Sequence, residues 1–313
     1  MKLIFMGTAH FSVTVAKRIH QYHPIDLIVT QPSKLKGRKK VLIDPPLKVF
    51  AQEKGIPVLQ PTRIKASVDD LLRHNPDMIV TAAYGQILPK ALLEAPKYGA
   101  INVHASLLPK YRGGAPIQRA IENGEDYSGV SIMYMAQKMD AGDIIATKRV
   151  QLDDKETNSS LFKKLATVGA DLLEEVMPNI IEGTIHPTKQ NPDLVTFAPN
   201  IKREEEKLDF HQDAVTLERK VRAFTPEPAT YFIVDNTPIK VYEVSIINPL
   251  DADQSKENGT VIAHEDEGVI IKVKNGAIRL DNVQPSGRKP MDGKSFLNGK
   301  GKQILPIGKK IDE

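Results

Sequence analysis

The sequence predicts an α/β fold in which a doubly wound, mostly parallel sheet is followed by a linker and a small closed β-barrel. Short apolar runs alternate with helical patterns through the first 150 residues, and parallel strands need such crossover helices. Residues 184–206 then hold three prolines and few apolar runs. Beyond them, short strands separated by tight turns favour a small antiparallel barrel.

The strands of the predicted sheet are short apolar runs bounded by turn residues. Such runs are typical of strands buried on both faces. In the first part of the chain they occur at residues 2–6, 25–30, 78–82, 100–104, 130–135 and 144–150.

Helical patterns separate several of these strands, at residues 47–54, 68–74 and 117–123. Gly55 and Gly124 follow two of the patterns as stop signals, and Ser67 precedes another as a candidate N-cap. A longer amphipathic helix is predicted over residues 159–181, because apolar residues recur there at spacings of three and four. Gly183 supplies the stop for this helix.

The part of the chain after the linker predicts one helix near residues 214–223 and then short strands. The strands are expected at residues 231–234, 239–244, 260–263, 269–273 and 277–283. Asp235-Asn236 and Asn275-Gly276 mark tight turns between neighbouring strands.

Composition excludes several classes of protein. With 41% hydrophobic and 26% charged residues, the chain is an ordinary globular mix and not a disordered or collagen-like one. No run approaches the ~20 apolar residues of a membrane-spanning helix, and the first seven residues are too short for a signal peptide, so we expect a cytoplasmic protein with no membrane partner. Cysteine is absent, which excludes disulfides, thiolate nucleophiles and cysteine zinc sites.

Basic residues gather in two stretches, although the net charge is only +4. Five of the seven residues 34–40 are basic, and residues 286–310 hold seven basic residues against the single acid Asp292. Composition alone leaves two explanations open, which are solvated surface segments and contacts with a polyanion.

Polar side chains gather where predicted strands end. Asn102 and His104 are two residues apart on strand 100–104, so both project from one face of the sheet. Residues 105–116 follow with two prolines and a glycine pair, which is typical of a shaped loop that approaches a ligand. Asp140 lies between the next two strands. Because an open parallel sheet has its ligand crevice at the carboxyl ends of its strands, the three side chains form a candidate site.

This constellation suits acyl transfer without a covalent enzyme intermediate. The carboxylate would orient and charge the imidazole, and the imidazolium and the amide would both donate to an oxygen that becomes negatively charged. Taken singly, each residue has a commoner explanation, namely a structural or exposed His and turn-forming Asn and Asp. Spacing alone therefore does not single out the reaction.

The turn after the first strand lacks a nucleotide-binding motif. Residues 7–12 do not form G-x-G-x-x-G, and no Gly-x4-Gly-Lys-Ser/Thr occurs in the chain. The sequence therefore lacks the motifs that would best indicate binding of a nicotinamide dinucleotide or a nucleoside triphosphate.

Two motifs carry a family resemblance: residues 101–118 read INVHASLLPKYRGGAPIQ, and residues 139–143 read MDAGD. They resemble the folate-dependent formyltransferases, which use 10-formyltetrahydrofolate as the formyl donor. The similarity continues into the C-terminal part and includes Gly7-Thr8, Gln31-Pro32, Gly37-Arg38, Ala83-Tyr84-Gly85 and Ile87-Leu88-Pro89. The central motif is specific for formyl transfer and less specific for the acceptor.

The resemblance implies a Rossmann-like catalytic domain over residues 1–187, a linker over 188–206 and an OB-like tRNA-binding domain over 207–313. It implies that the acceptor is the amino group of methionine on initiator tRNA, and that the enzyme needs no metal. We expect a monomer.

The resemblance also implies roles for particular residues. Catalysis would rest on Asn102, His104 and Asp140. The folate would be contacted by Ser106, Leu107, Leu108 and Pro109. A basic loop of about residues 33–41, which we expect to be irregular, would enter the tRNA acceptor stem through Lys36, Arg38, Lys39 and Lys40.

Three other functions stay open at this point. A related formyltransferase would act on glycinamide ribonucleotide or on an amino sugar, although the former has little use for a C-terminal domain. An inactive binding module would hold RNA without chemistry. A hydrolase would release formate to water from the same site.

Overall fold

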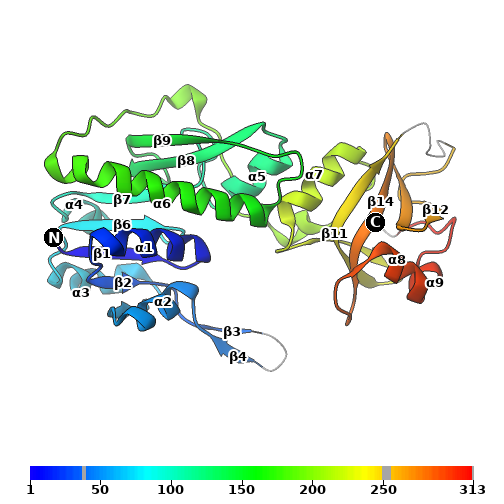
Figure 1. The fold of residues 1–313 in the computed structure, drawn as a ribbon, viewed down its shortest axis with the longest axis horizontal. Helices are drawn as coiled ribbons and strands as arrows, with labels where there is room; N and C mark the ends of the chain where they lie inside the picture. Colours follow the sequence, from blue (N-terminus) through cyan, green and yellow to red (C-terminus); the bar gives the residue numbers. More distant parts are fainter. Residues whose placement is uncertain (37–39, 249–254, 312–313) are drawn as a thin grey trace. The chain divides into compact units, whose positions relative to one another are not determined.

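The computed structural model describes residues 1–36, 40–248 and 255–311, which fall into two compact units (Figure 1). The units are interleaved along the chain. The first unit comprises Met1–Pro116, Tyr127–Leu152 and Phe162–Pro199, and the second comprises Ile117–Asp126, Asp153–Leu161 and Asn200–Glu313.

The first unit is built on a seven-stranded sheet with the order β5-β2-β1-β6-β7-β8-β9. The first five strands in this order run parallel, whereas β8 pairs antiparallel with both β7 and β9. Because β1 lies between β2 and β6, the chain extends the sheet first to one side and then to the other. The predicted doubly wound, mostly parallel sheet is confirmed, with strands β1 (Leu3–Gly7), β2 (Leu27–Val29), β5 (Val58–Leu59), β6 (Met78–Ala82), β7 (Ala100–His104), β8 (Tyr127–Tyr134) and β9 (Ile144–Gln151).

Helices α1 (His10–Tyr22) and α6 (Asn158–Glu182) cover one face of this sheet (Figure 1). The α6 helix approaches closely at Gly169, where an added Cβ would be 2.8 Å from Cγ1 of Val103 on β7. The rings of Phe11 and Phe162 also meet edge to face, with centroids 5.7 Å apart. These contacts fix the two helices over the centre of the sheet.

Other helices supply the opposite face. Leu71 of α3 (Val68–Arg73) and Leu92 of α4 (Lys90–Glu94) belong to one buried cluster with Ile4 and Ile79 of the central strands. Apolar side chains therefore cover both faces of the sheet, as its near-continuous apolar strands require. Helix α2 (Pro46–Lys54) also belongs to the first unit, whereas α5 (Pro116–Glu122) lies almost entirely in the second.

The predicted helix stops are confirmed by backbone conformation. Gly55, Gly124 and Gly183 have φ of 67°, 68° and 73°, a left-handed conformation that glycine adopts at little cost. Ser67 is the N-cap residue of α3 as predicted, but its side chain makes no capping hydrogen bond. Helix α1 was not among the predicted helices, although its buried residues Phe11, Val15, Ala16 and Ile19 have helical spacing.

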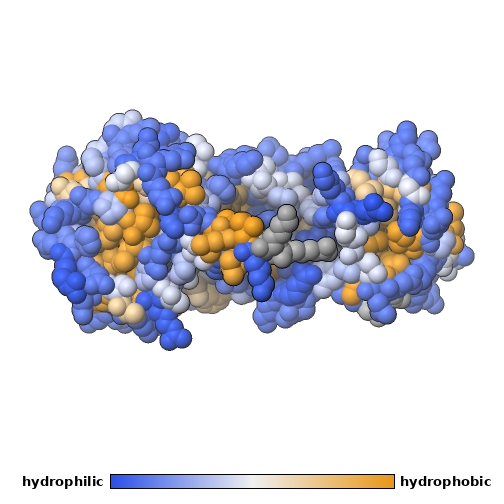
Figure 2. Space-filling model, turned by 90° about the horizontal axis from the view of Figure 1, so that it is seen from below, coloured by the Kyte–Doolittle hydropathy of each residue, from blue (hydrophilic) through white to orange (hydrophobic). Residues whose placement is uncertain are grey.

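The segment of about residues 33–41, expected to be an irregular basic loop, contains β3 (Lys34–Lys36), which pairs with β4 (Val41–Ile43) in an antiparallel hairpin. The expectation of an irregular segment is therefore wrong for residues 34–36 and 41. Figure 2 shows apolar side chains gathered on the hairpin, and its exposed apolar residues are Leu35, Val41, Leu42 and Ile43. Exposed apolar groups of this kind indicate a contact surface.

The second unit combines α7 (Ala214–Phe224) with an antiparallel sheet of the order β10-β11-β14-β13-β12, to which β15 adds on β14. The N-terminus of α7 is capped by Asp213, whose carboxylate accepts hydrogen bonds from Thr216 N (2.9 Å) and Oγ1 (3.0 Å). These bonds hold the pKa of the Asp213 carboxyl below its usual value. The strands and α-helices that follow α7 are β10 (Thr230–Val234), β11 (Thr237–Ile247), β12 (Val261–Glu265), β13 (Gly268–Val273), β14 (Gly276–Pro285), β15 (Met291–Asp292), α8 (Gly293–Phe296) and α9 (Lys302–Ile304).

The turn predicted at Asp235-Asn236 is present, whereas the one predicted at Asn275-Gly276 lies one residue earlier, at Lys274-Asn275, because Gly276 of β14 already pairs with Val273. Asp235 and Asn236 have φ of 47° and 61°, the left-handed pair that a two-residue hairpin turn requires. A closed barrel was expected here, whereas the strand order given above is an open path in the described part of the chain. The structure thus establishes a separate antiparallel sheet in the second unit.

Candidate active site

The predicted site residues lie where the parallel strands end. Strands β6 and β7 are neighbours, with Thr81 of β6 in register with Asn102 of β7. The direction of winding changes between β1 and β6, and open α/β sheets form their ligand crevice outside the strand ends at such a point. The carboxyl ends of β6 and β7 thus lie where a ligand is expected to bind.

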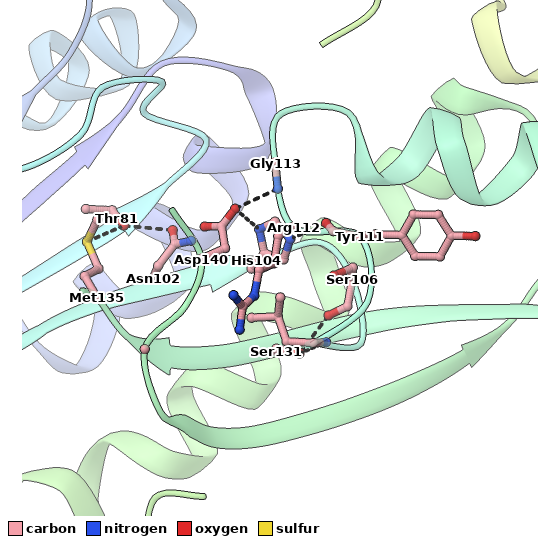
Figure 3. Close-up of polar contacts among 12 residues, drawn as sticks. Thr81, Asn102, His104, Ser106, Tyr111, Arg112, Gly113, Ser131, Met135 and Asp140 are labelled. Atoms are coloured by element: carbon pink, nitrogen blue, oxygen red, sulfur yellow. Dashed lines mark hydrogen bonds and ion pairs between the residues drawn. The ribbon is translucent and has the colours of Figure 1, made fainter. Parts of the chain in front are cut away.

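Asn102 is oriented by a neighbouring strand. Its Oδ1 accepts a hydrogen bond of 2.8 Å from Thr81 Oγ1. The amide nitrogen consequently points away from Thr81 and toward Asp140 in Figure 3, and it makes no hydrogen bond with any described residue. Asn102 is therefore held as a donor that has no acceptor within the described protein.

His104 ends β7 and is buried, with 6% of its surface exposed. Its Nε2 lies 3.0 Å from the carbonyl oxygen of Tyr111, to which a protonated Nε2 donates. Its Nδ1 faces Oδ2 of Asp140 at 3.8 Å, which is too long for a hydrogen bond. The carbonyl thus fixes the ring, and Nδ1 is the nitrogen left to exchange a proton or to meet a substrate oxygen.

Asp140 lies in the segment of residues 135–143 between β8 and β9, called the Asp140 loop below. Its φ of 49° is left-handed, a conformation unfavourable for most residues but tolerated by Asp. Its Oδ2 accepts a 2.9 Å hydrogen bond from the backbone nitrogen of Gly113. The carboxylate is thus fixed beside His104 by a donor on the loop of residues 105–116, called the catalytic loop below.

The three predicted catalytic residues are brought together. Figure 3 shows Asn102, His104 and Asp140 side by side at the end of the sheet, with the Asn102 amide nitrogen and the His104 ring both directed toward Asp140. Two donors and one carboxylate thus surround a small volume. This is the arrangement that stabilises an oxygen as it gains negative charge.

The residues predicted to contact folate form the start of the catalytic loop. Ser106 is buried, and its Oγ donates to the carbonyl of Lys110 at 2.7 Å. Leu108 is also buried, and its backbone nitrogen donates to Ser131 Oγ at 3.0 Å. Leu107 and Pro109 are half-buried. The side chains of Leu107 and Pro109 are thus more exposed to a ligand than those of Ser106 and Leu108. A folate contact by each of the four residues stays a prediction.

The predicted tRNA contacts are only partly covered by the structure. Lys36 is the last residue of β3, and Lys40 is exposed at the start of the return to β4. Arg38 and Lys39 lie outside the described residues, and so does the side chain of Lys36. Lys40 thus lies on the surface of the hairpin, directly before β4.

Several residues of the site were not predicted from the sequence. Thr81 orients Asn102, Tyr111 accepts from His104, and Gly113 donates to Asp140. Gln190 contacts both the Asp140 loop and the catalytic loop. Tyr111 and Gly113 belong to the glycine-containing loop that signalled the site, whereas no sequence pattern marks Gln190.

Tyr84 follows β6 at the same edge of the sheet but is not a candidate acid or base. Burial raises the pKa of Tyr84 to about 12, and the residue belongs to the core cluster under α3 and α4. Its phenol therefore stays protonated near neutral pH.

Neither a metal cluster nor a membrane helix is found in the described residues. Within 1–36, 40–248 and 255–311, no group of three or more His, Asp or Glu side chains is arranged to hold a metal ion. No helix in these ranges is long and apolar enough to cross a bilayer.

Comparison with known proteins decides the family. The family model described as "Formyl transferase" matches residues 1–177, and "Formyl transferase, C-terminal domain" matches residues 200–301. The chain belongs to the formyltransferase family. It is a formyl-transferring enzyme, and formyl-tetrahydrofolate is its donor.

The full-length relatives of this formyltransferase include methionyl-tRNA formyltransferases of two bacteria. It is 44% identical over 314 residues to a methionyl-tRNA formyltransferase of Macrococcus caseolyticus, covering 100% of this chain and 99% of that protein. It is also 44% identical over 315 residues to a methionyl-tRNA formyltransferase of Geobacillus thermodenitrificans, covering 99% and 98%.

Solved structures support the same fold at lower identity. HypX from Aquifex aeolicus in complex with tetrahydrofolic acid matches with a TM-score of 0.65 at 17% identity, over 97% of this chain and 48% of that one. An N-formyltransferase from Helicobacter canadensis with folinic acid and dTDP-3-aminofucose matches with a TM-score of 0.65 at 18% identity, over 90% and 99%. At these identities the two structures support the fold of the chain.

Proposed function

We propose that this formyltransferase transfers the formyl group of 10-formyltetrahydrofolate to the amino group of methionine esterified to initiator tRNA, in support of translation initiation. The full-length relatives at 44% identity support this acceptor over an amino sugar. The observation that carries the chemistry is the Asn102 amide nitrogen, an unpaired donor directed toward Asp140 beside His104.

The roles of the three residues follow from their geometry. As the uncharged amine adds to the formyl carbon, Asn102 Nδ2 and a protonated His104 Nδ1 donate to the oxygen that becomes negatively charged. The carboxylate of Asp140, 3.8 Å from His104 Nδ1, orients the imidazole toward the substrate. The amine then loses a proton, the nitrogen of tetrahydrofolate gains one, and the formyl carbon–nitrogen bond to the folate breaks.

Positioning supplies much of the remaining rate enhancement. Two bound substrates held with the reacting atoms in contact avoid the entropy cost of a bimolecular encounter. We propose that Ser106, Leu107, Leu108 and Pro109 help to place the folate, as their position at the start of the catalytic loop allows.

Binding of tRNA is proposed to use both basic stretches. In the second unit Arg288, Lys289, Lys294, Lys300 and Lys302 are exposed. The side chains of Lys309 and Lys310 form ion pairs with Asp235 and Glu257, which reduces their contribution to phosphate binding. Lys36, Arg38, Lys39 and Lys40 belong to the hairpin segment, whose apolar side chains suit unpaired bases of the acceptor end.

The decisive experiment compares acceptors. The protein is incubated with 10-formyltetrahydrofolate and with methionine-charged initiator tRNA, methionine-charged elongator tRNA, glycinamide ribonucleotide or an amino-sugar nucleotide. We expect formylation of the initiator tRNA at a much higher kcat/KM than any other acceptor. Formylation of a small acceptor alone would replace this proposal with the corresponding enzyme, and formate release without an acceptor would indicate a hydrolase.

Lys40→Ala and Arg38→Ala are expected to raise KM for the tRNA with little change in kcat. Each lost phosphate contact should reduce the slope of log affinity against log salt by about one. The slope is measured from tRNA binding between low and moderate salt, with Lys17→Ala on the exposed side of α1 as the control. A slope equal to that of the wild type in both variants would exclude phosphate contacts by these side chains.

The proposal also includes the domain organisation and state of the protein. A catalytic domain over residues 1–187, a linker over 188–206 and an OB-like tRNA-binding domain over 207–313 would suit an enzyme with one small and one large substrate. A monomer in the cytoplasm, where charged tRNA is available, completes the proposal.

A further inference from the structure

We propose that Gln190 is a positioning residue for formyl transfer, because its amide joins the Asp140 loop to Arg112 of the catalytic loop. The proposal deepens the proposed function and rests on it, since Asp140 has to act in the reaction for its position to matter.

One end of the Gln190 side chain holds the Asp140 loop. Its Nε2 donates to the carbonyl oxygen of Asp140 at 2.9 Å and to that of Gly142 at 2.7 Å. A primary amide has two N–H donors, so both are used on this loop. Gln190 thus fixes the backbone on each side of Ala141, next to the carboxylate that faces His104.

The other end holds the catalytic loop. The Oε1 of Gln190 accepts from Arg112 Nε at 3.0 Å and from Arg112 Nη2 at 2.7 Å. The two bonds share one acceptor atom and come from a charged donor, which makes them stronger than neutral hydrogen bonds. The amide cannot reverse its ends, because its NH2 group would then face the guanidinium and its oxygen would face two carbonyls.

Backbone pairings on both sides keep Gln190 in place. Before it, Thr188 and Ile144 exchange two hydrogen bonds of 2.8 Å. After it, Arg112 N donates to Thr196 O at 2.9 Å, and Ala198 N donates to Arg112 O at 2.7 Å. Residues 188–198 therefore pair with the start of β9 and with the catalytic loop, and Gln190 lies between the two pairings.

The need for such a contact follows from Asp140 itself. Its left-handed φ of 49° is a less stable conformation, which persists only where the surroundings determine it. Gln190 holds its carbonyl, and Gly113 holds its carboxylate. Loss of the first contact should let the loop relax and move the carboxylate away from His104 Nδ1, even though Gln190 does not touch the reacting atoms.

Gln190→Glu tests this inference, since the new carboxylate can still accept from Arg112 but has no N–H for the two carbonyls. We expect kcat to fall by about 10²-fold, as misplacement of an active-site group by about 1 Å can cause. The KM values of both substrates should stay within a factor of about three. Gln151→Glu, the same change at the exposed far end of β9, is the matched control and should keep wild-type kcat.

A double-mutant cycle separates positioning from general destabilisation. In single-turnover assays, Gln190→Glu should lower the rate of wild type but have almost no further effect in Asp140→Ala, because the group it positions is already gone. Gln190→Met, which has similar length and no charge, should repeat this result if the Glu variant fails to fold, and thermal unfolding monitors folding in each case.

Two results would overturn the inference. One is wild-type kcat in both folded Gln190 variants, and the other is an equal loss of rate in the wild-type and Asp140→Ala backgrounds. Near-normal turnover of Asp140→Ala would instead overturn the role of Asp140 in the proposed function, so the two failures are distinguishable.

Discussion

His104→Ala should lower kcat by about 10²- to 10³-fold, the range for removal of a preorganised donor to an oxyanion. The ring is buried and fixed through Nε2 by the Tyr111 carbonyl, so its removal leaves the site without the Nδ1 donor. KM for folate and tRNA should change much less, because the lost interaction forms only in the transition state. Steady-state formylation of charged initiator tRNA measures both quantities.

The control for this variant is His186→Ala, which removes an exposed imidazole from the same unit. Because His104 and Asp140 act as one unit, the double variant with Asp140→Ala should lose little more activity than His104→Ala alone. Multiplied losses in the double variant would contradict a shared role, and near-normal turnover of His104→Ala would remove the mechanism.

Asn102→Ala is the second variant from which we expect a loss of about 10²-fold or more in kcat. The amide nitrogen of Asn102 is held away from Thr81 and has no protein acceptor among the described residues. Asn102→Asp should be at least as damaging, because a carboxylate would repel the developing negative charge. Asn179→Ala, on the exposed side of α6, is the control.

Thr81→Val tests the residue that orients the Asn102 amide. The variant keeps the shape of Thr81 but removes the hydroxyl that donates to Asn102 Oδ1 at 2.8 Å. We expect a smaller loss of about tenfold in kcat, since the amide remains but is less firmly oriented. A loss in Thr81→Val greater than that in Asn102→Ala would show that Thr81 acts by another route.

Much of the first unit could be predicted because its signals are local. Apolar runs identified β1, β6 and β7, and glycines with left-handed φ ended α2 and α6 as expected. Helix α1 was missed despite its helical spacing, because its N-cap residue, Ala9, has no side chain that could cap it. Whether the second sheet closes depends on long-range strand pairing, which turn signals do not encode, so its open strand order could not be predicted.

The residues of the site also differ in whether local sequence signals could predict them. Asn102 and His104 could be paired from strand alternation, because both belong to β7. Gln190 could not be assigned to the site from the sequence, since it lies in an irregular, proline-containing segment. Its partners Arg112 and Asp140 are 78 and 50 residues away along the chain. Such a contact depends on the folded backbone and leaves no periodic pattern in the sequence.

The interleaved course of the chain bears on attempts to divide the enzyme or recombine it with relatives. In the second unit Arg119 binds Glu205 at 2.6 Å, and Arg222 binds the carbonyl of Glu156 at 2.7 Å. A gene fragment that stops at residue 187 would encode Arg119 without Glu205 and Glu156 without Arg222. Poor activity of that fragment would therefore reflect damaged packing as much as lost RNA affinity. Chimeras that exchange intact units would need junctions after residues 116, 126, 152, 161 and 199.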